Sequence, residues 1–238
     1  MKYNYIDAHF HIDGYKNHKK IFSDINNKSI YTLSVTNSPN IYVACLQNYL
    51  ETKFVKFALG FHPNLVGKMQ FDEQEFIKLV RHTKYIGEVG LDFSRQNIKY
   101  KNEQIIIFEK IVDIATRNNL LISIHSKNSN SELLRILKKY KPKKFILHWF
   151  KGTKNQISEF VQLGAYFSVN PDQIEDNNIM SIPLNRVLVE TDGPNNKLFK
   201  NNFSTDNIVF AYKILADKFG VSNLEEQCYK NFTNLLVK

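Results

Sequence analysis

The sequence is poor in cysteine. Only Cys45 and Cys228 occur among 238 residues, and they lie far apart and outside any metal-binding spacing. Isolated thiols argue against a disulfide framework and against a thiolate zinc site, because both need cysteines in groups. We therefore expect each thiol to be buried or incidental.

Long apolar runs are also absent. No stretch approaches the ~18 consecutive apolar residues that a membrane-spanning helix needs. The opening residues MKYNYIDAHFH contain neither the apolar core nor the cleavage site of a secretion signal. No Pro/Gly/Ser-rich linker or low-complexity tract divides the chain. The sequence thus predicts one cytoplasmic domain over residues 1–238 with no membrane partner.

Acidic residues are fewer than basic ones. The chain has 32 Lys and Arg against 23 Asp and Glu, which gives a net charge of +9. A basic surface favours acidic partners, of which nucleic acid is the commonest. The lysines are scattered, however, and a composition rich in Lys, Asn and Ile could simply reflect an AT-rich genome. The net charge is therefore compatible with nucleic-acid binding but does not by itself predict it.

Eight short runs rich in β-branched and aromatic residues occur along the chain, separated by segments with helical periodicity. Parallel strands need a crossover, usually a helix, so this alternation predicts a parallel sheet. Eight repeats predict an α/β fold closed into a TIM-type (β/α)8 barrel, regular or distorted, with its active site at the C-terminal strand ends. The predicted strands are Tyr3–His11, Ile30–Thr36, Phe54–His62, Tyr85–Asp92, Leu120–His125, Lys144–Phe150, Ala165–Asn170 and Arg186–Asp192.

Apolar residues at three- and four-residue spacing mark the helices between these runs. Two more helices are predicted after the last strand, over Asp206–Phe219 and Leu224–Val237. The clearest apolar stripes are Ile105, Phe108, Ile111, Val112 and Ala115, and then Leu133, Leu134 and Leu137.

Polar residues able to bind metal or phosphate stand at the end of most predicted strands. Five of the seven histidines lie there, and in a parallel barrel all these strand ends share one face. Groups that are distant in the sequence would therefore converge. The motifs are DAHFH (7–11), GFHP (60–63), GEVGLD (87–92), HSK (125–127), HWF (148–150) and ETDGP (190–194).

Each of these residues alone has an ordinary explanation. A histidine can be a hydrogen-bonded core residue, a glutamate a salt-bridge partner and an aspartate a helix cap. Together they are harder to explain, because buried ionisable groups are costly unless they are paired or bound to metal. Side chains at i and i+2 of a strand share a face, so His9 and His11 can aim at one ion. A two-metal site accounts for all six of His9, His11, Glu88, His125, His148 and Asp192.

These motifs resemble, in the same order, those of TatD-type deoxyribonucleases in the amidohydrolase superfamily. The likeness runs from about residue 5 to residue 194, and six ordered motifs are far more specific than any one of them. The resemblance implies that His9, His11 and Asp192 hold one metal ion, and that Glu88 bridges it to a second. Mixed imidazole and carboxylate ligands suit several divalent ions, with Mg, Mn or Zn as candidates.

The resemblance also implies that His125 and His148 hold the second ion and that His62 lies near the substrate phosphate. Lys127 stands where the family usually has arginine, and a lysine offers a point charge instead of a bidentate fork. The usual Cys-Phe-Ser-Gly after the histidine of strand six is replaced by a segment that begins with Trp149. These departures leave the substrate contacts less well defined than the metal ligands.

The resulting prediction is a metal-dependent deoxyribonuclease, exonuclease-like with 3'-5' polarity as one option, that hydrolyses phosphodiester bonds with two metal ions and an activated water. We expect Glu88 to fix the spacing of the metals and Asp192 to accept or relay a proton. His62 and Lys127 are predicted to contact phosphate oxygens. Further candidate contacts, which can equally be solvated or packing side chains, are Arg95, Trp149 and Lys151.

Two other functions stay open. The first is a hydrolase of a small cyclic amide or lactone, although many dinuclear members of the superfamily bridge their metals with a carboxylated lysine where this chain has Glu88. The second is a catalytically silent subunit that binds nucleic acid or assembles with other proteins. The presence of all six ligand residues argues against such a loss of catalysis. DNA and RNA both remain candidate partners.

A narrower likeness concerns the TatD-type nuclease of the bacterial Qat anti-phage system. It rests on three segments, Tyr31–Pro39, Ala58–Pro63 and Ile146–Phe150. This likeness implies a role in antiviral defence beside other proteins that are encoded in the same operon.

Overall fold

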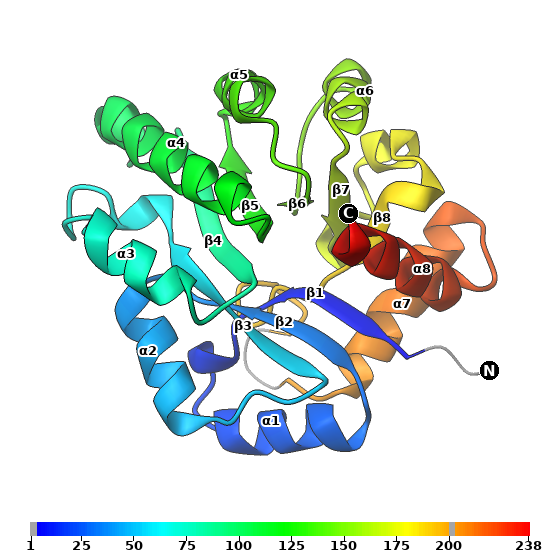
Figure 1. Cartoon of the computed structure of the whole chain (residues 1–238). Coiled ribbons are helices and arrows are strands. Elements are labelled where there is room, and N and C mark those ends of the chain that lie inside the picture. The colour runs from blue at the N-terminus through cyan, green and yellow to red at the C-terminus, as the bar shows by residue number, and fades with distance from the viewer. Residues whose placement is uncertain (1–3, 200–202) are drawn as a thin grey trace.

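Eight parallel strands form one sheet in sequence order in the computed structural model, which describes residues 4–199 and 203–238 (Figure 1). Each neighbouring pair from β1·β2 to β7·β8 is parallel, so the predicted barrel of alternating strands and helices is confirmed. The strands are β1 Ile6–Phe10, β2 Tyr31–Val35, β3 Val55–Phe61, β4 Tyr85–Asp92, β5 Leu121–Lys127, β6 Phe145–His148, β7 Tyr166–Val169 and β8 Val187–Val189.

Several strand ends differ from the predicted ones, and β5 runs to Lys127, two residues past its predicted end. β4 begins and ends as predicted, but β6 ends at His148 because Trp149 has a φ of 39°, in the left-handed region. β8 ends at Val189, before the predicted end, and Asp192 has a φ of 48°. The predicted start of the first strand, Tyr3, lies outside the described residues.

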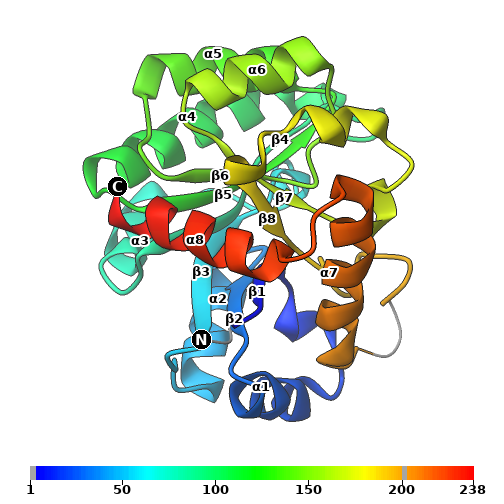
Figure 2. The same cartoon turned by 90° about the vertical axis from the view of Figure 1, so that its right-hand side faces the viewer.

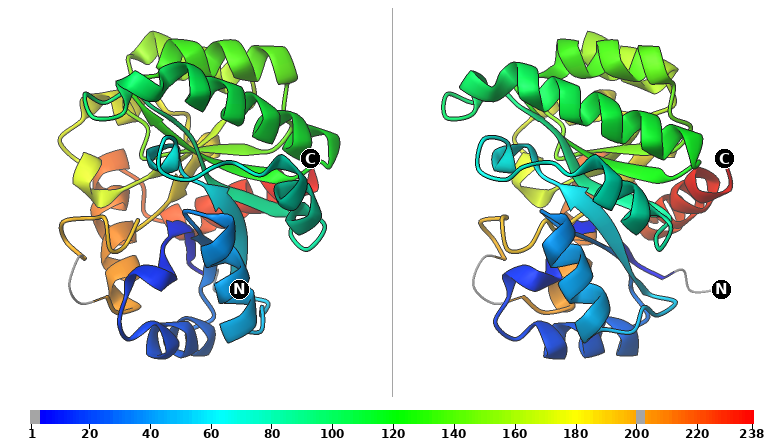
Figure 3. Two further views of the ribbon diagram at one scale, coloured as in Figure 1. Left: turned by 90° about the vertical axis from the view of Figure 1, so that its left-hand side faces the viewer. Right: turned by 60° about the vertical axis from the view of Figure 1, so that its left-hand side comes forward.

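Helices surround the strands on the outside of the barrel (Figure 1 and Figure 2). Both C-terminal helices begin and end where the sequence predicts. Helices α4, α5 and α6 follow one another side by side beyond β4, β5 and β6 (Figure 3). The helices are α1 His18–Asn27, α2 Pro39–Asn48, α3 Glu73–Val80, α4 Lys101–Arg117, α5 Asn130–Tyr140, α6 Lys154–Gln162, α7 Asp206–Phe219 and α8 Leu224–Val237.

Apolar side chains fill both sides of the sheet. The apolar stripe of α4, represented by Phe108, Ile111 and Val112, is buried in the larger core cluster between strands and helices. A second cluster consists largely of small and aliphatic strand residues such as Ala8 and Leu33, and it also contains Leu235 of α8. Burial of this apolar surface is the main favourable term in folding, and it holds the strand ends in fixed positions.

The barrel is joined between its first and last strands by a few specific bonds. No regular ladder connects β1 to β8 within the described residues. Instead the backbone N–H of Asp192 donates to the carbonyl of His9 at 3.0 Å. The buried Asp7 carboxylate accepts from the backbone N–H of Thr191 at 3.0 Å and from its hydroxyl at 2.5 Å. Closure of the barrel therefore also brings the residues after β1 and β8 together.

Both cysteines are buried, as the sequence predicts. The Cys228 thiol lies 3.6 Å from the carbonyl of Val187, and burial raises its pKa to about 12. In the described ranges, no helix combines the length and the apolar character that crossing a membrane would require.

Candidate metal centre

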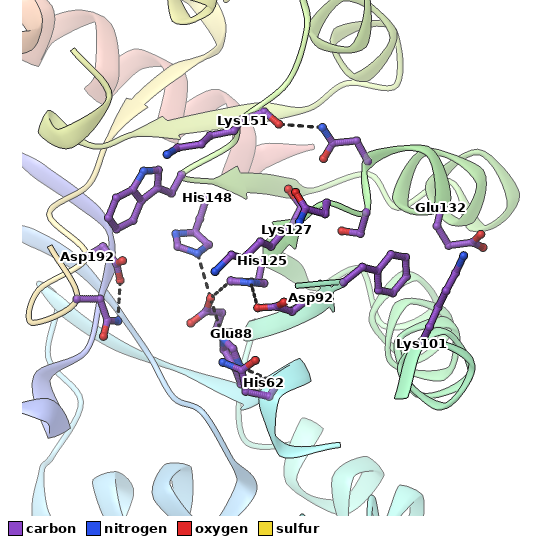
Figure 4. A pocket seen from close by; sticks show the side chains of 18 of the residues that line it. His62, Glu88, Asp92, Lys101, His125, Lys127, Glu132, His148, Lys151 and Asp192 are labelled. Atoms are coloured by element: carbon purple, nitrogen blue, oxygen red, sulfur yellow. Dashed lines mark hydrogen bonds and ion pairs between the residues drawn. The ribbon is translucent and has the colours of Figure 1, made fainter. Parts of the chain in front are cut away.

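All six predicted metal ligands lie together at the C-terminal end of the barrel, and Figure 4 shows four of them, Glu88, His125, His148 and Asp192. They come from four different strands and from the residues that directly follow two strands, so the barrel topology is what assembles them. The imidazole of His125 is partly exposed to the cleft, and the other five side chains are buried. The six are His9, His11, Glu88, His125, His148 and Asp192.

One oxygen of Glu88 faces a first group of ligand atoms. Glu88 Oε2 lies 3.6 Å from His9 Nε2 and 3.3 Å from His11 Nε2. Asp192 Oδ1 lies 3.7 Å and 3.5 Å from the same two nitrogens. Ligand atoms held tetrahedrally about 2.1 Å from an ion stand about 3.4 Å apart, so these four contacts match the spacing around one cation.

The other oxygen of Glu88 faces a second group. Glu88 Oε1 lies 2.7 Å from His125 Nδ1, 3.0 Å from His148 Nε2 and 3.3 Å from His62 Nε2. The carboxylate thus stands between two sets of imidazoles with one oxygen directed at each. This is the arrangement that a bridging carboxylate needs.

Two of the histidines are oriented by partners at Nδ1. His9 Nδ1 lies 2.9 Å from the hydroxyl of Ser123, and His148 Nδ1 lies 3.4 Å from Glu190 Oε1. Glu190 Oε2 in turn accepts a hydrogen bond from the Ser168 hydroxyl. A proton at Nδ1 that is held by such a partner leaves the lone pair on Nε2, which is the nitrogen that faces Glu88 in both rings.

The remaining imidazoles have different roles. His125 Nε2 lies 3.4 Å from Asp92 Oδ2, which leaves Nδ1 as the nitrogen directed at Glu88. His62 Nδ1 accepts from the backbone N–H of Asn64 at 3.0 Å, so the neutral ring carries its proton on Nε2. A protonated Nε2 can donate to an oxygen but cannot coordinate a metal. The geometry therefore makes His62 a hydrogen-bond donor at the edge of the second group.

Buried nitrogen atoms without partners support a cation in this site. Within the described residues, His9 Nε2 and both ring nitrogens of His11 are buried and make no hydrogen bond. Leaving such an atom unsatisfied costs about 1–3 kcal/mol. A divalent ion would satisfy the two Nε2 atoms and the facing carboxylates together, and hence the residues present fit a metal centre.

Burial and neighbouring charges together set the pKa values of the residues in the site. Burial holds the pKa of His9 well below its ordinary value, with a further contribution from His148, so the ring is neutral as a metal ligand must be. Burial alone would raise the pKa of Glu88, but the nearby His62 and His148 hold it well below its ordinary value. Burial raises the pKa of Asp192 to about 7 against the opposing influence of His148. A bound cation would favour its ionised form.

A cleft of about 890 Å³ opens above the metal-ligand residues. His62 and Lys127, the two predicted phosphate contacts, both line it, and Lys127 reaches over His125 into the cleft (Figure 4). Trp149 and Lys151 line it as well. Arg95 is exposed and is not among the cleft residues, so that candidate phosphate contact has no support here.

The sequence did not assign roles to the residues that hold the ligands in place. Glu190, Asp92 and Asp7 stand inside the motifs, and each contacts a ligand or an adjacent residue. Ser123 precedes His125 by two residues on β5 and faces His9. Their only signal in the sequence is that Asp7, Ser123 and Glu190 each lie two residues from a proposed ligand and Asp92 lies four residues from Glu88, which does not reveal a partner on another strand.

The amino-acid sequence is similar to a known protein family and to several individual proteins. The family profile described as TatD related DNase matches residues 6–237. An uncharacterized metal-dependent hydrolase of Buchnera aphidicola is 27% identical over 97% of this chain and 95% of its own length. The deoxyribonuclease Tat-D of Schizosaccharomyces pombe is 32% identical over 45% of this chain, and the match spans 37% of that protein.

Two further comparisons concern a human relative and a solved structure. The human 3'-5' RNA nuclease TATDN2 is 26% identical over 82% of this chain, which spans only 29% of that longer protein. The crystal structure of YjjV, a TatD homologue from Escherichia coli, superimposes with a TM-score of 0.85 at 20% identity and covers 97% of both chains. The structural likeness supports the barrel fold.

Proposed function

Because this chain belongs to the TatD-related DNase family of metal-dependent hydrolases, we propose that it is a nuclease that hydrolyses phosphodiester bonds in DNA with two divalent ions. The observation that carries the proposal is the position of Glu88, whose two oxygens face two separate groups of ligand atoms. A single ion would use only one of these groups.

The proposed ligand sets follow from the two groups. His9, His11 and Asp192 would hold the first ion with Glu88 Oε2, while the second set consists of Glu88 Oε1, His125 and His148. Ions bound there would make a water nucleophilic at neutral pH and offset the charge that develops on the phosphate. Mg, Mn and Zn are the candidates for their identity.

The protein's own residues complete the proposed reaction. Asp192 lines the cleft, and its Oδ1 also accepts from the Asn195 amide at 3.2 Å. We assign Asp192 as the acceptor of the proton that the attacking water loses, because its Oδ2 makes no contact described in residues 4–199 and 203–238. The Nε2 proton of His62 and the ammonium group of Lys127 would hold the non-bridging phosphate oxygens.

End-labelled substrates provide the test. We expect the purified protein to shorten a labelled DNA strand stepwise from its 3' end with Mg²⁺, Mn²⁺ or Zn²⁺, and to leave it intact in EDTA. Single- and double-stranded DNA and RNA should be compared, since a relative is named an RNA nuclease. Hydrolysis of cyclic amides or lactones without cleavage of any nucleic acid would contradict the proposal.

A matched pair of variants checks that the cleavage belongs to the site. Glu88→Gln keeps the shape of the side chain and removes the charge between the two groups, so activity should fall at least about 1,000-fold. Glu175→Gln removes the same charge from an exposed residue outside the cleft and should cleave like the wild type. Equal activity of the two variants would exclude the two-metal site as the source of cleavage.

Other expectations from the sequence stay predictions. A cytoplasmic location, a role in antiviral defence and partners from the same operon rest on the sequence and its narrower likeness alone. The nuclease proposal does not depend on any of them.

A further inference from the structure

The lysines that line the cleft within residues 4–199 and 203–238 lie on one side of it. Lys101 stands at the start of α4, Lys127 at the end of β5 and Lys151 between β6 and α6, and all three side chains line the cleft. They come from three consecutive strand-to-helix connections, so they follow one another along the same wall (Figure 4). We call this the lysine wall.

Acidic residues near the lysine wall are already paired. Glu132 lies beside Lys101 in Figure 4, and its carboxylate forms an ion pair with Arg135. Asp92 contacts His125 and accepts from the backbone N–H of Ser94 at 2.8 Å. The positive charge of the wall is therefore left largely available to a bound anion.

Aromatic rings accompany the lysines. Lys101 Nζ lies 5.2 Å from the ring centre of Phe93, and both side chains line the cleft. Trp149, two residues before Lys151, lines the cleft too, and its Nε1 is a buried donor without a partner in the described part of the chain. Grooves that bind single strands combine cations for the phosphates with aromatic rings for the bases.

The opposite side of the cleft carries two amides but, unlike the lysine wall, no lysine or arginine among its described lining residues. The connection after β2 contributes Asn37 and the one after β8 contributes Asn195. The Oδ1 atom of Asn37 is buried and has no hydrogen-bond partner in the described ranges. We call these residues the amide wall. The metal-ligand residues form the floor between the two walls.

We propose that a single polynucleotide strand runs along the lysine wall and that its terminal nucleotide, the one to be released, sits against the amide wall. This inference rests on the proposed nuclease function. The body of the strand carries one negative charge per nucleotide and gains from each lysine it passes. The terminal nucleotide brings only the phosphate that is cleaved, which the metal centre holds, so its sugar and base need neutral hydrogen-bonding groups.

The test compares two double variants of equal charge. Lys101→Gln with Lys151→Gln removes two cations of the lysine wall, outside the metal-ligand set. Lys99→Gln with Lys154→Gln removes two exposed cations that are close in sequence but are not cleft residues. Melting temperatures of both variants should stay near that of the wild type, because all four side chains are exposed.

Substrates of two lengths distinguish an effect on binding of the strand from an effect on cleavage of the bond. For a 12-nucleotide single strand, the lysine-wall variant should raise KM about tenfold with kcat nearly unchanged, whereas for a dinucleotide it should match the wild type. Binding of the same 12-mer, followed by fluorescence anisotropy in EDTA, should lose about 1.4 from the slope of log K against log salt, or about 0.7 per lysine. The Lys99/Lys154 variant should change neither quantity.

Three outcomes would overturn the inference. Equal effects of the two double variants on the 12-mer would show that only overall charge matters, and equal loss with the dinucleotide would place the lysines at the cleaved bond. In both cases the wild type still cleaves, so the nuclease proposal survives. If the wild type cleaves neither substrate with any of the metals, the nuclease proposal itself fails, and the strand path fails with it.

Discussion

At the scale of single residues, the chemistry of the site depends on which nitrogen of each imidazole carries the proton. Ser123 and Glu190 hold Nδ1 of His9 and His148, and Asp92 lies beside Nε2 of His125. In a neutral His9 or His148 ring, the nitrogen that faces Glu88 is then the one left with a lone pair. Partners of this kind raise the basicity of the ligand and fix its orientation, and their loss typically weakens metal binding by about 10–100-fold.

Glu190→Gln tests this role, because the change keeps the side chain's size and removes the charge that faces His148 Nδ1. Glu190 also accepts from the Trp149 backbone N–H at 3.0 Å, so the amide oxygen can preserve one of its bonds. We expect one of two bound ions to lose about 10–100-fold in affinity and the other to be little changed. Isothermal titration of the metal-free protein with Mn²⁺ or Zn²⁺ measures this directly.

Glu175→Gln is the control for the loss of one negative charge, since Glu175 is exposed. If Glu190→Gln binds both ions as tightly as this control does, Glu190 does not position His148. Equal weakening of both ions would instead indicate a general disturbance of the site.

At the scale of elements, the ends of β1 and β8 decide whether the first ligand group can form. His9 and His11 belong to one end of the sheet order and Asp192 to the other, so they meet only when the barrel closes. The Asp7 carboxylate makes two of the bonds across this closure, both to Thr191. Closure of the barrel and assembly of the first ligand group are therefore coupled.

Asp7→Ala should weaken both. The change leaves two buried donors of Thr191 without an acceptor, at about 1–3 kcal/mol each. We expect the free energy of unfolding to fall by about 2–6 kcal/mol in urea titrations of the metal-free protein, with a larger loss of affinity at the first ion than at the second. Asp7→Asn retains one acceptor oxygen and should lie between the wild type and Asp7→Ala. Unchanged stability of Asp7→Ala would show that the barrel closes without this carboxylate.

At the scale of the whole molecule, positive charge is distributed unevenly. Ion pairs on the outer helices, such as Lys110–Glu73 and Lys138–Glu159, offset part of the basic charge. The lysine wall retains its charge, while two carboxylates and several imidazoles are concentrated on the barrel floor. The floor brings ligands from both ends of the strand order together, so an ion bound there links the whole barrel.

Metal binding should therefore stabilise the entire fold. An ion at 100 times its dissociation constant contributes about 2.7 kcal/mol. For a chain of this length each kcal/mol raises Tm by about 2–4 °C, so each ion should raise it by about 5–10 °C relative to the protein in EDTA. Thermal unfolding with and without Mn²⁺ provides the measurement, and Glu88→Gln serves as the control with little expected shift. A wild-type Tm that does not respond to any divalent ion would argue against a resident metal.

The sequence by itself determined the order of the strands and the residues that stand at their ends. Apolar runs and their period are local properties, and a parallel barrel places every C-terminal strand end on one face. For this reason the sequence predicts that His9, Glu88 and Asp192 lie close together although they are far apart in the chain. The two C-terminal helices were predicted to the residue, since their apolar periodicity is also local.

Only the tertiary structure decided how the site is held and which way the cleft faces. The left-handed backbone at Trp149 and Asp192, the partner of each imidazole and the bonds from Asp7 to Thr191 all depend on groups from other strands. The position of the described cleft lysines on one side depends on which connections fold over which strand ends. Such contacts have no period along the chain, because they join residues that meet only after the barrel has closed.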